Sequence, residues 1–398
     1  MDPIRRRIAA TPLRATPRTR PASVEALVAD LRPEEPVHVL RPRRFAATAA
    51  EFLAGFPGRT LYAVKCNPEP AVLRALWAGG VREFDAASAA EVRLVRNLFP
   101  TAQIHFMHPV KARSAIREAH GQHGVRSFVL DSAEELAKIL AETGNARDLT
   151  LVVRLALPKG GAVMDLSGKF GAEPAEAAAL LAAARPHARR LGVSFHVGSQ
   201  CLEPLAYARA IGRAAAVIRA AGVPVEVLDV GGGFPVAYPG TVPPALATFM
   251  GAIRGAVAKE GLGAMDLWAE PGRALVASGA TLVVQVQARK GGDLFINDGV
   301  YGALSDAGAP RFRFPARKLG AASAAPAVAF RFWGPTCDSA DVMEGPFLLP
   351  ADIAEGDWIE IGQIGAYGAC LRTGFNGFDR AGMVELEDTE IPALALAA

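Results

Sequence analysis

Several residues able to do chemistry stand at the ends of short apolar runs. Lys65 and Glu270 each follow such a run, His196 lies within one, and a glycine triplet at 231–233 follows another. An ammonium is costly to bury unless it is paired or chemically converted. Lys65 therefore either forms a Schiff base, for example with pyridoxal phosphate (PLP), or lies on the surface beyond a strand.

The neighbouring residues fit a phosphorylated, planar cofactor. The glycines 231–233 offer unshielded N–H groups to a phosphate, although glycine runs also form ordinary turns. Arg273 could grip a phosphate with its forked donors. Glu270 could pair with a pyridinium nitrogen, or simply with Arg273 in a local ion pair. His196 could lie flat against the cofactor ring, or it could be a core histidine.

The elements that must position these residues form an alternating pattern. Alanine-rich segments such as 175–190 suit helix and separate the apolar runs. Strand alternating with helix predicts parallel βαβ units, and eight of them make a (β/α)8 barrel. An open doubly wound sheet is the alternative, disfavoured because no GxGxxG follows the first run. The eight predicted strands are 61–64, 83–86, 104–107, 127–130, 149–155, 193–197, 225–230 and 266–269.

In such a barrel, the chemistry gathers where the strands end. Nearly every predicted strand end is ionisable or a glycine cluster, which predicts a site at this mouth. In chain order these ends are Lys65, Asp85, His108, Asp131, Arg154, His196, Gly231 to Gly233 and Glu270.

After about residue 280 the pattern changes to alternating runs at 281–288, 327–333 and 358–361, which predict antiparallel β structure. The segment 37–40 is expected to add a strand to it. We therefore predict a barrel over 42–279 and a β-rich domain over 280–398 that includes 1–41.

Composition narrows the function classes. The 398-residue chain has a net charge of +3, which gives no case for nucleic-acid binding. No apolar run reaches the roughly 18 residues that span a bilayer. The arginine-rich start is expected to be a loosely ordered arm, with a transit peptide as the alternative. Four scattered cysteines predict neither a metal site nor a disulfide framework, and they favour the cytoplasm: Cys66, Cys201, Cys337 and Cys370.

From about residue 61 to 378, the chain resembles the fold type III PLP-dependent amino-acid decarboxylases, most closely the ornithine branch. The resemblance rests on eight motifs in family order: Tyr-Ala-Val-Lys-Cys-Asn, Phe-Asp-Ala-Ala-Ser, His-Val-Gly-Ser, Asp-Val-Gly-Gly-Gly-Phe-Pro, Glu-Pro-Gly-Arg, Asn-Asp-Gly-Val-Tyr-Gly, Gly-Pro-Thr-Cys-Asp and Phe-Asn-Gly-Phe. It implies an alanine racemase-like TIM barrel with a C-terminal β domain.

The resemblance also implies residue roles. Lys65 would carry PLP, His196 would stack on its ring, and Glu270 would pair with the ring nitrogen. Cys337 and Asp338 would reach the site from the partner subunit of a head-to-tail homodimer, Cys337 as the proton donor to the α-carbon. Tyr301 and Phe375 would complete the substrate pocket. The remaining cofactor contacts would be Asp85, Arg154, Ser199, Gly231, Gly232, Gly233, Arg273 and Tyr367.

The implied reaction is decarboxylation of L-ornithine to putrescine, with Asp338 binding the distal ammonium. A second aspartate that the eukaryotic ornithine enzymes carry in a Tyr-Asp-His context is absent, and Asp306 could replace it. An altered loop could also admit lysine, since one methylene shifts discrimination by only about 1–3 kcal/mol. Arg311 and Arg313 in this loop receive no role.

Other readings remain open. Lysine decarboxylase, a dual lysine/ornithine enzyme and diaminopimelate decarboxylase lie within the same class, although the last tends to carry Cys-Glu-Ser where this chain has Cys337-Asp338. Alanine racemase needs a tyrosine as its second base. A catalytically dead regulatory homologue usually loses the cofactor lysine, which this chain keeps. A single-barrel PLP carrier would leave the β-rich domain unexplained.

Overall fold

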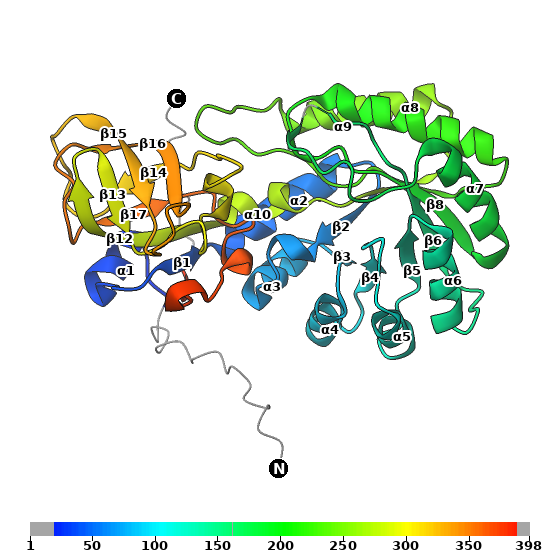
Figure 1. The fold of residues 1–398 in the computed structure, drawn as a ribbon, viewed down its shortest axis with the longest axis horizontal. Helices are drawn as coiled ribbons and strands as arrows, with labels where there is room; N and C mark the ends of the chain where they lie inside the picture. Colours follow the sequence, from blue (N-terminus) through cyan, green and yellow to red (C-terminus); the bar gives the residue numbers. More distant parts are fainter. Residues whose placement is uncertain (1–19, 161, 388–398) are drawn as a thin grey trace, which may run out of the picture.

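The computed structural model describes residues 20–160 and 162–387. The predicted N-terminal arm therefore lies almost wholly outside the described residues. At its described end, Arg20 pairs with Glu385 at 2.5 Å. Two lobes make up the described chain, a barrel and a β-rich sheet (Figure 1).

The barrel lobe confirms the predicted (β/α)8 fold, with eight strands closed in a ring. Every neighbouring pair is parallel, so all strands end at one mouth. In chain order the strands are β2 Arg59–Ala63, β3 Glu83–Ala86, β4 Gln103–Phe106, β5 Ser127–Leu130, β6 Thr150–Arg154, β8 Arg190–Ser194, β10 Val227–Asp229 and β11 Asp266–Ala269.

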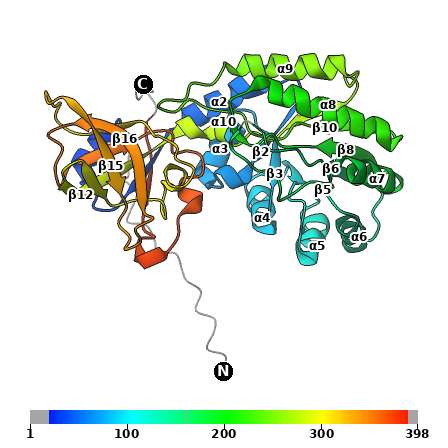
Figure 2. The same ribbon diagram turned by 45° about the horizontal axis from the view of Figure 1, so that its top comes forward.

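Helices cover the outside of the ring (Figures 1 and 2). Ser88 and Ser132 cap two of them by accepting the backbone N–H groups of Glu91 and Glu135, each at 3.2 Å, because a hydroxyl can satisfy a free first-turn donor. The helices are α2 Pro42–Gly55, α3 Pro70–Ala78, α4 Ala89–Leu98, α5 Arg113–Gly121, α6 Ala133–Glu142, α7 Pro174–Ala184, α8 Pro204–Ala221, α9 Leu246–Lys259 and the short α10 Arg273–Val276.

A separate apolar cluster of residues from the barrel strands and the chain just after β4 is buried apart from the helix-facing core. Its members are Leu61, Met107, Val129, Val152, Val227 and Trp268. Side chains packed in this way make a barrel interior solid, so ligand chemistry is confined to its mouth.

Several boundaries differ from the sequence pattern, most of them by one or two residues, as three examples show. Strand β8 begins at Arg190 and ends at Ser194, so 195–197 already belong to the mouth. The helix expected over 175–190 ends at Ala184, where Arg185–His187 tighten into a 3₁₀ turn around a proline. Val64 likewise enters the 3₁₀ turn Val64–Cys66 instead of strand β2. Lys65 therefore lies in the middle of that turn, directly beyond strand β2.

The second lobe is an eight-stranded sheet. Strand β1, Val37–Leu40, joins it as expected, antiparallel to β12 and parallel to β18. Most sheet pairs are antiparallel, with β13 parallel to β15. Its other strands are β12 Ala280–Lys290, β13 Asp293–Ile296, β14 Ala316–Lys318, β15 Ala327–Trp333, β16 Val342–Pro350, β17 Trp358–Ile361 and β18 Gly382–Glu385.

A buried ion pair anchors the segment between β1 and α2 to the β-rich sheet. Arg41, directly before α2, contacts Glu360 on β17 at 2.9 Å, and both side chains are at most 5% exposed. Arg317 on β14 pairs with the other oxygen of Glu360 at 2.5 Å. The predicted domain limits at 279 and 280 stay a prediction, in which Arg41 and Glu360 both belong to the β-rich domain.

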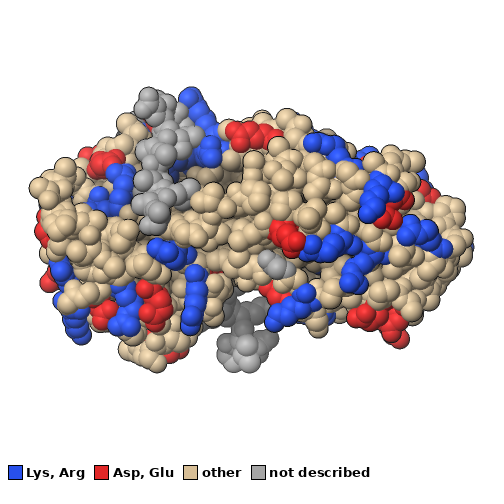
Figure 3. Space-filling model, turned by 90° about the horizontal axis from the view of Figure 1, so that it is seen from above, with Lys and Arg blue, Asp and Glu red and all other residues tan. Residues whose placement is uncertain are grey.

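Charged side chains of both signs are interspersed on the face shown in Figure 3. Within the described ranges, no helix has the length and apolar character required to cross a membrane. All four cysteines are unpaired.

Candidate active site

Lys65 lies at the mouth beside a buried carboxylate. Its ammonium nitrogen is 3.2 Å from Asp85 on β3, and the Lys65 side chain is 46% exposed while that of Asp85 is 1% exposed. The negative charge of Asp85 raises the pKa of Lys65, against the opposing effect of burial. The structure thus places an accessible, charged amine where a cofactor carbonyl could reach it.

His196 follows β8 in the same mouth. Its Nδ1 accepts the backbone N–H of Gly198 at 3.0 Å, which fixes the ring orientation. Burial lowers the pKa of His196 well below its usual range, and the charges of Arg154 and Lys65 lower it further. His196 is therefore neutral near pH 7, as suits a ring that stacks on an aromatic cofactor.

Glu270 forms a carboxyl pair with Asp229, which ends β10. Burial is the main cause that raises the pKa of Glu270, followed by the charge of Asp229. Burial also raises the pKa of Asp229 to about 6, although the N–H of Gly231 donates to it at 2.8 Å. The Glu270 Oε1 atom is buried without a hydrogen-bond partner. The Oδ2 atom of Asp229 is likewise buried without a partner, so the pair holds a proton near neutral pH and the Glu270 Oε1 atom is free to accept a hydrogen bond.

The glycine triplet after β10 is packed backbone against backbone. A Cβ at Gly231 would lie 2.2 Å from the carbonyl oxygen of Phe195, and a Cβ at Gly232 would lie 2.6 Å from that of Glu270. Gly231 and Gly233 also adopt positive φ, which favours glycine. Ser199, the first residue of β9 (Ser199–Cys201), follows His196 at this mouth. Small residues are thus required where a phosphate would approach.

Arg273, at the start of α10, is the most enclosed cation of the site. Its side chain is 4% exposed and contacts Asp306 at 2.9 Å, while its Nη1 donates to the Tyr238 hydroxyl at 2.9 Å. The rings of Phe312 and Tyr367 lie 4.7 and 5.1 Å from the guanidinium carbon. Within the residues that the structure describes, the Nε group has no partner, and Nη2 contacts only the carboxylate of Asp306, so both groups could turn to a phosphate that displaces this ion pair.

This placement of Asp306 differs from the expectation drawn from the sequence. Asp306 was expected to face the distal ammonium of a substrate, but its carboxylate lies buried against Arg273. The structure therefore groups it with the predicted phosphate ligands.

A second cluster of predicted site residues lies in the β-rich lobe. The Tyr301 hydroxyl donates a short hydrogen bond to Asp338, and the ring of Tyr301 contacts that of Phe375 with centroids 5.0 Å apart. Cys337 is exposed, and its backbone N–H donates to Asn376 at 3.0 Å. Among the described residues, no hydrogen bond or ion pair joins this cluster to Lys65 in the same chain.

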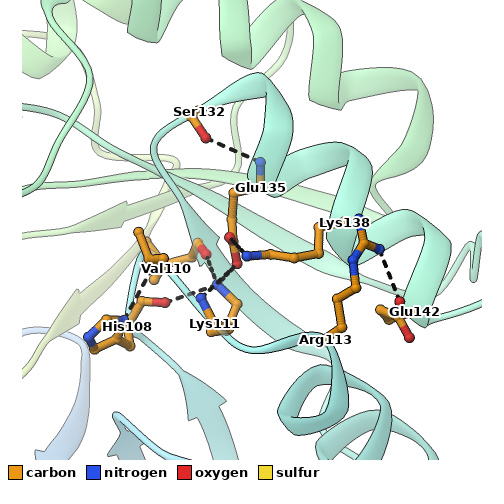
Figure 4. A network of polar contacts seen from close by, with 9 residues as sticks. His108, Val110, Lys111, Arg113, Ser132, Glu135, Lys138 and Glu142 are labelled. Carbon is orange, nitrogen blue, oxygen red and sulfur yellow. Dashed lines mark hydrogen bonds and ion pairs between the residues drawn. The ribbon is translucent and has the colours of Figure 1, made fainter.

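A buried network supports the mouth between β4 and α6 (Figure 4). Lys111 is completely buried and donates to the carbonyl oxygens of Val129 at 2.6 Å and His108 at 2.9 Å. Glu135 pairs with Lys111 at 2.9 Å and with Lys138 at 2.5 Å. Burial lowers the pKa of Lys111 to about 8. The network holds the loop of His108 in place.

The mouth fits PLP, the cofactor implied by the resemblance. Lys65 would hold its aldehyde carbon, and the open Oε1 of Glu270 would meet the ring nitrogen. The Nε and Nη2 groups of Arg273 and the glycine backbone would hold the phosphate. These unsatisfied polar atoms are buried in the structure, where a missing partner is costly.

Sequence reasoning missed two residues of this site. Asp229 stood in a recognised motif, but only its fully buried side chain beside Glu270 reveals a role in holding a proton. Tyr238 gave no signal in the sequence, because its contact with Arg273 joins residues 35 positions apart.

Known proteins resemble the chain over most of its length. The family model "Pyridoxal-dependent decarboxylase, pyridoxal binding domain" matches residues 42–277. A lysine/ornithine decarboxylase from Selenomonas ruminantium is 33% identical over 338 residues, 82% of this chain and 83% of that protein. The ornithine decarboxylase of Schizosaccharomyces pombe is 34% identical over 356 residues, 83% and 78% of the two chains. A crystal structure of lysine/ornithine decarboxylase from Vibrio vulnificus, complexed with cadaverine, matches with a TM-score of 0.78 and 32% identity, covering 92% of this chain and 95% of that one.

Proposed function

The chain belongs to the PLP-dependent decarboxylase family, and from that premise we propose that it converts L-ornithine to putrescine and CO2. The observation that carries the choice of substrate is the short hydrogen bond from Tyr301 to Asp338. It fixes an otherwise accessible carboxylate beside Cys337, where a distal ammonium could be bound.

When bound, PLP supplies a ring that accepts the electron pair left as the carboxylate departs as CO2. Lys65 would hold the cofactor through its side-chain amine. Glu270 would hold a proton at the ring nitrogen, because a buried carboxylate with an open oxygen is stabilised by a positive partner. The neutral His196 covers one face of the ring without adding charge.

Cys337 and Asp338 act from the partner subunit in this proposal. Within one chain they lie in a cluster of the β-rich lobe, next to exposed apolar side chains. Phe375 is 45% exposed, Phe378 44% and Leu371 43%. Exposed apolar side chains that gather around functional groups are typical of an interface. A twofold dimer would cover them and bring the Cys337 thiol to the α-carbon, where it donates a proton.

Lysine is the second candidate substrate. The lysine/ornithine decarboxylases that resemble this chain are named for both amino acids. The burial of Asp306 against Arg273 supports this candidate, because it leaves Asp338 as the one predicted carboxylate in the substrate cluster. A single carboxylate discriminates weakly between substrates whose side chains differ by one methylene.

The cytoplasmic location stays a prediction, drawn from the four scattered cysteines of the sequence.

The test is a competition experiment. Purified PLP-loaded protein receives ornithine, lysine and meso-diaminopimelate at equal concentration, and the products are separated and quantified. We expect putrescine to predominate and Asp338→Asn to raise KM for ornithine by roughly 10- to 100-fold, the value of one charged hydrogen bond. Asp352→Asn, at an exposed aspartate of the same lobe, is the matched control. Predominant cadaverine or lysine would overturn the ornithine assignment and leave the decarboxylation in place.

A further inference from the structure

Asp306 occupies a position that the decarboxylation mechanism does not use. Its carboxylate is 5% exposed and lies 2.9 Å from the Nη2 atom of Arg273. It belongs to the 3₁₀ turn Ser305–Ala307, and its carbonyl oxygen accepts the N–H of Phe312 at 2.8 Å. That hydrogen bond folds the loop back so that the Phe312 ring faces the same guanidinium. The loop thus places the carboxylate of Asp306 against the guanidinium of Arg273.

The charge around Asp306 does not balance once a phosphate is present. In the described part of the chain, Arg273 is the one cation that contacts it, and a phosphate dianion would bring two further negative charges to that cation. The other titratable groups that face Asp306 are neutral near pH 7: Tyr238, Cys66, Tyr367 and Cys370. Like charges in an enclosed site repel strongly, so one of the anions must take up a proton.

We propose that Asp306 is a proton-coupled gate on cofactor binding: it neutralises Arg273 in the empty site and takes up a proton when the PLP phosphate binds. Arg273 then becomes free to pair with the phosphate through Nε, which has no hydrogen-bond partner among residues 20–160 and 162–387, and through Nη2, which Asp306 releases. Asp306 is a positioning residue, because it acts on the cofactor through Arg273. This inference rests on the cofactor role of Arg273 in the proposed function.

The direction of the pH effect follows from linkage. Burial already raises the pKa of Asp306, although Arg273 opposes that shift. A bound phosphate raises it further, so the bound state holds more protons between the two pKa values. The contribution of Asp306 therefore favours PLP binding most at low pH, and it weakens PLP affinity as pH rises by up to about tenfold per pH unit for one proton. Asp306→Asn removes this dependence because an amide carries no charge.

The experiment measures cofactor binding by the full-length apoprotein without substrate. Dissociation constants for PLP are determined from about pH 5.5 to about pH 8.5, and proton uptake is obtained by calorimetry in buffers of different ionisation enthalpy. We expect wild type to take up one more proton than Asp306→Asn on binding PLP, and the variant to bind at least about tenfold more tightly near pH 8. Asp306→Ser is measured in the same way, in case the asparagine variant fails to fold.

Two controls isolate the phosphate and the carboxylate. Pyridoxal, which lacks the phosphate, is expected to bind wild type and variant equally. Tyr238→Phe removes the other hydrogen-bond partner of Arg273 without changing its charge, and it is expected to keep the extra proton. Equal or weaker PLP binding by both Asp306 variants, with unchanged proton uptake, overturns the gate. PLP that binds wild type no more tightly than pyridoxal does overturns the phosphate role of Arg273 as well. Neither result depends on which amino acid is decarboxylated.

Discussion

Asp85 is buried and lies 3.2 Å from Lys65, whose side chain remains half exposed. The carboxylate thus holds Lys65, the proposed cofactor lysine, in its charged form while leaving it accessible. Because only a neutral amine attacks a carbonyl carbon, Asp85 also sets the pH at which Lys65 can capture PLP.

Replacing Asp85 by asparagine should lower the pKa of Lys65, since the charge of Asp85 is the main cause that raises it. The rate at which apoprotein captures PLP, followed by absorbance, should then reach its plateau at lower pH than in wild type. Glu203→Gln, at an exposed carboxylate paired with Arg209, is the control and should leave the profile unchanged. A profile that stays in place in Asp85→Asn would contradict this role of Asp85.

Replacing Glu270 by glutamine should lower kcat by roughly 10²- to 10³-fold, the usual effect of losing one electrostatic partner of a transition state. PLP binding should persist, because Lys65 and Arg273 are untouched. The measurement is steady-state putrescine formation together with cofactor occupancy. Loss of PLP at unchanged kcat per bound cofactor would show that Glu270 serves binding alone.

Replacing Cys337 by alanine should lower amine formation by roughly 10²- to 10⁴-fold if its thiol donates the proton. CO2 release should then exceed amine release, because the loss of CO2 precedes protonation. Cys201→Ala, at a buried cysteine outside the substrate cluster, is the control. Full turnover with equal CO2 and amine in Cys337→Ala would exclude the thiol as the donor.

The buried Lys111 should make stability depend on pH. Its pKa of about 8 in the folded state lies below the ordinary value of 10.5, so the unfolded chain binds more protons between these values. Wild-type stability should therefore rise with pH in that window, by about 1 kcal/mol per pH unit relative to Lys111→Met. Urea unfolding at about pH 8 and about pH 9.5 tests this. If wild type and Lys111→Met show the same pH dependence of stability, this role of Lys111 is contradicted. The control is Lys290→Met, at an exposed lysine, which should show the pH dependence of wild type.

The sequence predicted the barrel and most of its mouth for a physical reason. A parallel strand buried on both faces is mostly apolar, so the run before Glu270 stands out against its polar flanks. Polar side chains at or near the ends of these strands, such as Asp85 in β3, lie at the mouth. Strand position and site position are therefore read from the same pattern.

The pattern of apolar runs did not predict contacts between loops that are distant in the sequence. The approach of Asp306 to Arg273 depends on how one loop folds back, and the hydrogen bond of Tyr238 to Arg273 depends on the path of another. Neither contact produces a periodic pattern of apolar residues in the sequence. Burial and the proximity of Asp229 raise the pKa of Glu270. Neither cause can be read from the sequence, because both depend on the packing of two strand ends side by side.

The central claim is that each active site combines Lys65 of one subunit with Cys337 of the other, and mixing two inactive variants tests it most directly. Lys65→Ala and Cys337→Ala are mixed under conditions that exchange subunits, and putrescine formation from ornithine is measured. Random pairing gives one intact site in half of the dimers, so activity should return to about one quarter of wild type. Complete inactivity of the mixture, with hybrid dimers demonstrated, would contradict a site shared between subunits.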